Sequence, residues 1–92
     1  MSREDDLRAA LRVLQPQHLS LRDDSHLHAG HAGAKAGGGH YAVHIVSADF
    51  VGKSTVTRHR MVYSALAEML RQEIHALTLR TETPQEFASN TF

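Results

Sequence analysis

The amino-acid sequence predicts a single α+β domain, a two-layer αββαβ(α) sandwich whose helices cover one face of a three-stranded mixed sheet. The spacing of apolar residues along the chain changes from the period of a helix to the alternating pattern of a strand, and then back to the helical period. This gives the order helix, strand, strand, helix, strand, short helix. A strand–helix–strand unit in the second half requires the last two strands to run parallel, with a right-handed crossover. The length fits one domain over residues 1–92, with a core at about residues 5–88.

The N-terminal segment predicts a helix followed by a short strand. Ser2 and Asp5 have the spacing of a capping box, with Asp in place of the preferred Glu. The helix presents one apolar stripe, formed by Leu7, Ala10, Leu11 and Leu14. Pro16 ends the helix, because the residue before a proline avoids the helical conformation. Residues 19–24 then alternate apolar and polar side chains, as expected of a half-buried strand.

The second predicted strand covers residues 41–47. Apolar residues occupy both of its faces, which favours a central position in the sheet. We expect it to pair antiparallel with the first strand across residues 25–39, a segment rich in Gly, Ala and His. A connection of this length in so small a domain is usually functional or disordered.

The second half of the chain predicts a turn, a helix, a strand and a short terminal helix. Residues 49–53 have the composition of a turn, and residues 57–70 repeat apolar side chains with helical spacing. Residues 75–81 alternate as a third strand. Thr83 is expected as the N-cap of the last helix and Pro84 at its first position, where a missing N–H is tolerated.

The composition limits the classes of function. Ten basic and ten acidic residues give a formal net charge of zero, which argues against a general nucleic-acid binder with a strongly basic face. The absence of cysteine excludes disulfides and thiolate chemistry from this chain. No apolar run follows the charged N-terminus, so we expect neither a signal peptide nor a membrane span, and a cytoplasmic location.

No motif in the sequence indicates an enzyme. Gly52-Lys53-Ser54 resembles the end of a phosphate-binding loop, but such a loop needs another glycine five residues earlier, where Ser47 stands. No serine has the setting of a nucleophile elbow. A domain of 92 residues also has little volume for a deep substrate cavity. We therefore expect a binding module.

Eight histidines are the distinctive chemical feature of the chain. His26, His28 and His31 are close together in the 25–39 segment, and they could wrap a zinc or nickel ion. A closed zinc site usually has four ligands, often thiolates, so solvated loop histidines are the alternative interpretation. Three further histidines are expected to be structural or surface residues: His18, His40 and His44.

A series of motifs along the chain resembles the BolA family. The motifs are Asp24-Ser25, His31, His40-Tyr41, Val43-His44-Ile45-Val46-Ser47, Phe50-x-Gly52, Arg58-His59-Arg60-x-Val62-Tyr63, Ile74-His75-Ala76-Leu77 and Thr83-Pro84. The resemblance extends from about Leu7 to Phe87, and the Arg-His-Arg motif with the downstream His-Ala-Leu is its most specific part. It implies an αββαβ fold similar to class II KH domains, in agreement with the element order above.

The resemblance also implies a partner and a cofactor. BolA proteins pair with monothiol glutaredoxins carrying a Cys-Gly-Phe-Ser motif, and together they hold a bridging [2Fe-2S] cluster in iron–sulfur assembly or iron homeostasis. The matching ligands here are His75, which opens the third strand, and His31 in the loop, with His28 as the alternative loop ligand. Thiolates would come from the glutaredoxin and glutathione, a division of ligands similar to that of a Rieske centre. The isolated protein is expected without a cofactor, as a monomer or weak dimer.

The basic segment from Lys53 to Arg60 has two functional interpretations. Arg58, His59 and Arg60 could recognise the glutaredoxin or its glutathione. Together with Lys53 they could instead contact DNA, since KH-like folds bind nucleic acid and some BolA proteins are transcriptional regulators of stress response and morphology. Three local cations reach only a few phosphates, and residues 52–55 do not match the Gly-x-x-Gly clamp of KH domains. A solvated helix start is the structural alternative.

Overall fold

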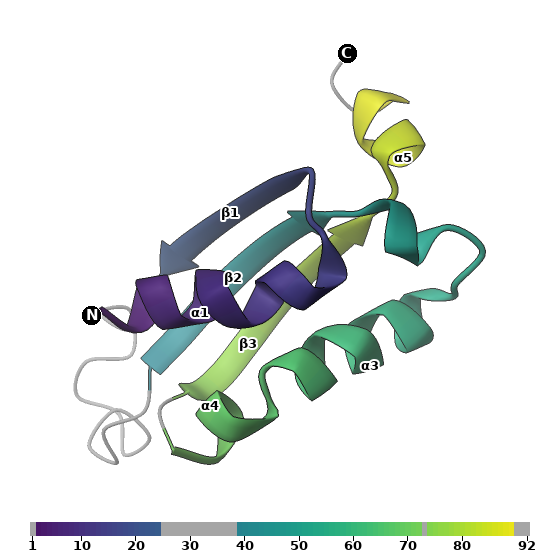
Figure 1. Ribbon diagram of the computed structural model, residues 1–92. Coiled ribbons are helices and arrows are strands. Elements are labelled where there is room, and N and C mark those ends of the chain that lie inside the picture. Colours follow the sequence, from purple (N-terminus) through teal and green to yellow (C-terminus); the bar gives the residue numbers. More distant parts are fainter. Residues whose placement is uncertain (1, 25–38, 73, 90–92) are drawn as a thin grey trace.

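The computed structural model describes residues 2–24, 39–72 and 74–89, with only the backbone of His75 (Figure 1). Its elements in chain order are α1 (Arg3–Leu11), η1 (Arg12–Leu14), β1 (His18–Asp23), β2 (Gly39–Val46), η3 (Ala48–Phe50), α3 (Thr55–Ala65), α4 (Ala67–Gln72), β3 (Ile74–Glu82) and α5 (Pro84–Ser89). The α+β class and the order of the strands and main helices are as predicted. The two short 3-10 helices, η1 and η3, were not predicted.

The sheet has the strand order β1-β2-β3. β1 pairs antiparallel with β2, with Leu21 opposite Val43, and β2 pairs parallel with β3, with Val43 opposite Leu79. The apolar faces of β2 therefore predicted its central position correctly. The parallel pairing predicted for the last two strands is also confirmed.

The first helix begins and ends where local chemistry requires. The Ser2 hydroxyl accepts a hydrogen bond from the amide of Asp5 (3.1 Å), and the Asp5 carboxylate accepts one from the amide of Ser2 (3.4 Å), which completes the predicted capping box. α1 continues into η1, and the chain then turns at Gln15, whose φ is 52°. Pro16 follows directly, so the predicted end of the helical segment is confirmed.

The single helix predicted over residues 57–70 is wrong in its start and its continuity. α3 begins earlier, at Thr55, because the Ser54 hydroxyl caps it by accepting a hydrogen bond from the amide of Thr57 at 3.2 Å. The chain changes direction at Leu66, where φ is −103° and ψ is 12°, and continues as α4. α4 packs against β3, so this bend delivers the chain to the start of that strand.

One hydrophobic cluster joins the helices to a single face of the sheet. Its fully buried members include Leu7 and Leu11 from α1, Val43 and Ile45 from β2, Phe50 from η3, and Val62 and Leu66 from the α3 region. Alternation along β2 places His40, Ala42 and His44 on the opposite face. The sheet therefore has one face covered by the core and one outer face that bears polar side chains. No helix among the described residues is long and apolar enough to span a membrane.

Candidate functional site

The predicted cluster ligand His75 lies at an irregularity of the sheet. Gly39 of β2 pairs with Ile74, and the next residue, His40, pairs with Ala76, so the pairing skips His75. An extra residue on one strand is a β-bulge, a feature over-represented at sheet edges and next to active sites. The backbone of His75 is therefore set apart from the regular ladder on either side.

The segment that carries the other predicted ligands precedes β2 in the sequence. β2 begins at Gly39, and Gly39 pairs with Ile74, the neighbour of His75. His26, His28 and His31 belong to that segment and lie outside the described residues. Among the side chains that the structure does describe, no group of three or more His, Cys, Asp or Glu could hold a metal ion.

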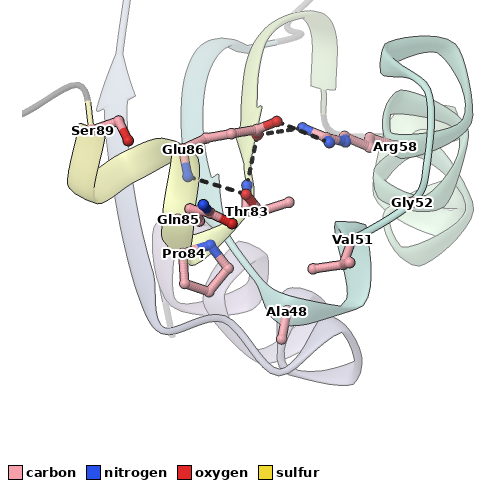
Figure 2. Close-up of a pocket in the computed structure, with 9 residues that line it drawn as sticks. All are labelled: Ala48, Val51, Gly52, Arg58, Thr83, Pro84, Gln85, Glu86 and Ser89. Atoms are coloured by element: carbon pink, nitrogen blue, oxygen red, sulfur yellow. Dashed lines mark hydrogen bonds and ion pairs between the residues drawn. The ribbon is translucent and has the colours of Figure 1, made fainter.

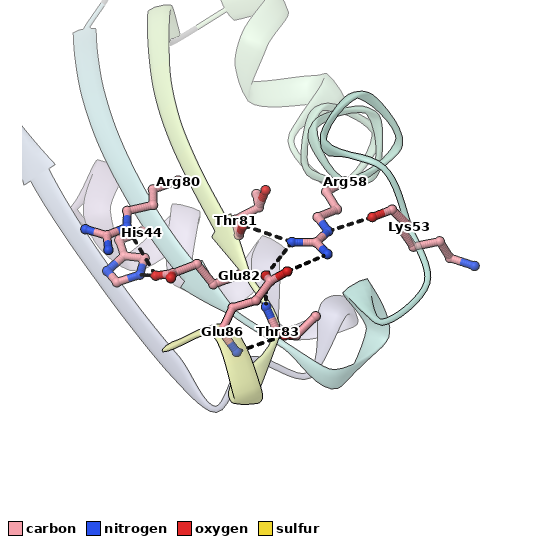
Figure 3. A network of polar contacts seen from close by, with 8 residues as sticks. All are labelled: His44, Lys53, Arg58, Arg80, Thr81, Glu82, Thr83 and Glu86. Atoms are coloured by element: carbon pink, nitrogen blue, oxygen red, sulfur yellow. Dashed lines mark hydrogen bonds and ion pairs between the residues drawn. The ribbon is translucent and has the colours of Figure 1, made fainter. Parts of the chain in front are cut away.

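Arg58, predicted to contact a partner or DNA, is held by groups from its own chain (Figure 3). Its Nε donates to the carbonyl oxygen of Lys53 at 2.9 Å, and its Nη1 donates to that of Thr81 at 3.3 Å. Nη1 and Nη2 donate to the two carboxylate oxygens of Glu86, at 2.7 and 3.2 Å. Only 12% of the Arg58 side chain is exposed, so this guanidinium joins α3, β3 and α5.

A second capping box, formed by Thr83 and Glu86, holds the Glu86 side chain in position. The Thr83 hydroxyl accepts from the amide of Glu86 at 3.1 Å, and Glu86 Oε1 accepts from the amide of Thr83 at 2.8 Å. The hydrogen bond from Arg58, reinforced by the one from the Thr83 amide, lowers the pKa of Glu86 from 4.5 to about 2. The Thr-x-x-Glu spacing of a capping box is the sequence signal that marks Glu86.

A groove lies beside this ion pair, between α5 and the turn that follows η3 (Figure 2). Its volume is about 620 Å³, and it is lined by Ala48, Val51, Gly52, Arg58, Thr83, Pro84, Gln85, Glu86 and Ser89. The turn is of type II, because the Lys53 amide donates to the carbonyl of Phe50 at 3.0 Å and Gly52 has a φ of 76°. Arg58 and Glu86 neutralise each other in this groove, so it offers no uncompensated charge from these two residues.

The four predicted contact residues are therefore not equivalent. Arg58 is engaged within the fold, whereas Lys53 in the turn and Arg60 on α3 are exposed, and His59 is half-buried. In Figure 3 the Lys53 side chain extends away from Arg58. Within the described part of the chain, neither Lys53 nor Arg60 forms an ion pair. Contact of these four residues with a partner or with DNA stays a prediction.

Two strand histidines anchor α5 from the other side. The ring of His18 stacks on Phe87 with centroids 4.9 Å apart, and the ring of His44 meets His18 edge-on at 5.0 Å. Nε2 of His44 lies 2.5 Å from Oε1 of the buried Glu82, and the same oxygen forms an ion pair with Nε of Arg80 at 3.1 Å (Figure 3). These contacts agree with the structural role expected for His18 and His44.

The family profile of BolA-like proteins matches residues 10–86. The chain is 43% identical over 84 residues to the Escherichia coli protein named DNA-binding transcriptional regulator BolA, a match covering 91% of this chain and 74% of that protein. It is 40% identical over 88 residues to BolA-like protein 1 of Mus musculus, covering 95% of this chain and 62% of the relative. Two further relatives from Arabidopsis thaliana, SufE-like protein 1 and protein BOLA1, are longer than this chain. The matches cover only 22% and 51% of their length, respectively.

Solved structures of BolA proteins have the same fold as this chain. The fold superimposes on the BolA domain of SufE1 from Arabidopsis thaliana with a TM-score of 0.81 and 39% sequence identity. The superposition covers 94% of this chain and 96% of the plant domain. The resemblance inferred from the motifs is therefore confirmed over nearly the whole chain.

Proposed function

Because this chain belongs to the BolA-like protein family, we propose that it is a non-catalytic adaptor. It binds a monothiol glutaredoxin and shares a bridging [2Fe-2S] cluster with it, in iron–sulfur assembly or iron homeostasis. The observation that supports the proposal is the β-bulge at His75, which lies beside Gly39, the residue that follows the 25–38 segment in the chain. We expect the shared cluster to take its ligands from these two parts of the sequence.

The donor chemistry of the chain fits such a half-site. The chain contains no cysteine, so it offers imidazoles and leaves the thiolates to the glutaredoxin and its glutathione. His75 holds one ligand position on β3, and His31, with His28 as the alternative, supplies the other. When bound, the cluster would supply a redox-active iron–sulfur centre, with neutral imidazoles on one iron as in Rieske proteins. Because protonated imidazole cannot bind iron, this histidine pair makes the shared site sensitive to acid near pH 6.

Anaerobic reconstitution tests this function. The full chain is mixed with a monothiol glutaredoxin, iron, sulfide and glutathione, then examined by size exclusion and visible absorption and circular dichroism. We expect a heterocomplex whose spectrum differs from that of the glutaredoxin alone. His75→Ala should remove this spectral difference between the heterocomplex and the glutaredoxin alone. His31→Ala should reduce the spectral difference more than His28→Ala does.

The matched control is His18→Ala, which removes an imidazole at the other end of the sheet, opposite Val46. It should keep the wild-type cluster spectrum. The proposal fails if the wild-type chain forms no heterocomplex, or if the spectrum is the same with and without the His75 imidazole.

A second candidate function is DNA-binding transcriptional regulation. The name of the Escherichia coli relative supports it, as do the exposed side chains of Lys53 and Arg60. Binding through these cations should weaken steeply with salt, and Lys53→Ala should reduce the salt slope by about one. Arg58→Ala is a poorer test because the Arg58 guanidinium already forms an ion pair with the Glu86 carboxylate. This candidate would be ruled out if the affinity for duplex DNA stayed the same when the salt concentration was raised and when Lys53 was changed to Ala.

A further inference from the structure

Three of the four exposed large apolar side chains in the described part of the chain lie on η1 and α3. Val13 is 69% exposed on η1, and Val56 and Tyr63 are 59% and 43% exposed on α3. Leaving large apolar groups in water is unfavourable, and exposed apolar patches are typical of interaction surfaces. This surface is separate from the His75 bulge and from the groove beside Glu86.

A mainly apolar groove runs between η1 and α3. Its volume is about 480 Å³, and it is lined by Val13, Leu14, Thr57, Arg60, Met61, Ser64 and Ala65. Leu14, Met61 and Ala65 belong to or pack against the hydrophobic core, so their backbone positions are fixed. The groove therefore has a firm apolar wall on α3 and an exposed valine on η1.

Arg60 stands between this groove and the apolar side chains farther round α3. Helical spacing puts Val56 and Tyr63 on one side of Arg60, four residues before it and three after it, and Ser64 on the groove side. Arg58, two residues before Arg60 on the same helix, has an acidic partner, Glu86. Arg60 has no such ion pair in the described part of the chain, and none of the residues lining the groove is acidic.

We propose that this surface, the η1–α3 groove with Arg60, Val56 and Tyr63, binds an acidic segment of a partner protein. An apolar side chain of the segment fills the groove, and a carboxylate beside it pairs with Arg60. Arg, Tyr and Met are the side chains enriched at protein interfaces and their hot spots. A planar guanidinium matches a carboxylate through two parallel hydrogen bonds. Phosphate contacts would leave the apolar flanks unused, which favours a protein over DNA.

Amide shifts in the NMR spectrum of the full chain test the proposal. The probe is an eight-residue peptide with a central Leu-Phe flanked by Asp and Glu, titrated to about 1 mM, where a Kd in the millimolar range is measurable. Shifts are expected at Val13, Arg60 and Met61. Arg60→Glu and Val13→Asp should each weaken binding about tenfold or more, as hot-spot changes do. Arg71→Glu is the matched control, since Arg71 is an exposed cation on α4, and it should leave the affinity unchanged.

Three outcomes would overturn the proposal. The first is the absence of shifts with the acidic peptide. The second is an equal response to the same peptide with Lys in place of Asp and Glu. The third is that a mixed-sequence DNA duplex shifts the Arg60 amide and the acidic peptide does not, which would assign this surface to nucleic acid. The test uses no glutaredoxin, so it is independent of the cluster-sharing proposal.

Discussion

Arg58 and Arg60 lie two residues apart on α3, yet their side chains have different surroundings. Arg58 bonds two backbone carbonyls and the Glu86 carboxylate and is almost buried. Arg60 faces solvent beside an apolar groove. The Arg-His-Arg motif of the sequence therefore combines an internal connector with an exposed cation. Helical geometry separates the two side chains by about 200° around the axis, which explains the difference.

The ion pair between Arg58 and Glu86 predicts a specific pH dependence of stability. The pKa of Glu86 is lowered from 4.5 to about 2 in the fold. A carboxyl group with a lowered folded-state pKa stabilises the protein above its unfolded pKa, and this stabilisation is lost as the pH falls through the folded pKa. The isosteric change Glu86→Gln should therefore lower Tm at pH 6, and the difference from wild type should disappear as the pH falls from about 5 to about 2.

Thermal unfolding followed by circular dichroism from pH 7 to pH 2 measures this difference. The matched control is Glu68→Gln, because Glu68 is 78% exposed and its contact with Arg71 is 3.4 Å long. Exposed pairs of this kind contribute little, so Tm should change little at any pH. A gap between Glu86→Gln and wild type that stays constant down to pH 2 would contradict the assigned ion pair.

At the scale of elements, the turn between η3 and α3 sets where the basic segment begins. Gly52 occupies the third position of a type II turn, where φ must be positive. A Cβ at this glycine would meet nothing within 4 Å, so backbone conformation rather than space requires glycine. The turn leads to Lys53 and the Ser54 cap, and so fixes the start of α3 and the approach of Arg58 to β3.

Gly52→Ala should therefore destabilise the fold by about 1–2 kcal/mol, the cost of placing a side chain in the left-handed region. Gly52→Asn should cost less, because Asn tolerates positive φ. Urea unfolding of the three proteins measures both effects. Equal stability of Gly52→Ala and wild type would show that the turn has another conformation.

At the scale of the whole molecule, one small core connects both layers. Phe50 is fully buried on η3, and it belongs to the same cluster as Leu7 of α1 and Val62 of α3. A domain of this size buries only about 60–70% of its unfolded surface, less than a large domain does, so each large core residue matters. Within the described part of this chain, α5 contacts the outer face of the sheet through Phe87, which packs on His18 and His44.

Phe50→Ala should lower the free energy of unfolding by about 3–5 kcal/mol, the usual cost of removing a buried phenylalanine. Since domains are stable by only about 5–15 kcal/mol, this variant is expected at the limit of folding. The neighbouring Val51 is 62% exposed, and Val51→Ala should change stability by no more than about 0.5 kcal/mol. Urea titrations of both variants provide the test, and similar effects of the two changes would contradict the burial of Phe50.

The sequence alone determined the element order, the central place of β2 and the first capping box. Each of these depends on residues close together in the chain, whose spacing and polarity are visible without a structure. The motifs also determined the family. Helix boundaries were less accurate: Ser54 moved the start of α3, and the bend at Leu66 had no Gly or Pro to mark it.

Only the tertiary structure decided which functional candidates are engaged within the fold and which lie exposed. Glu86 is 28 residues from Arg58 in the sequence, so no local pattern could show that its carboxylate binds the Arg58 guanidinium. The bulge at His75 likewise exists only through the pairing of β3 with β2. The exposure of Arg60 beside Val13 depends on the packing of η1 against α3. Local spacing fixes periodicity and caps, whereas burial, ion pairing and strand register arise when distant segments meet.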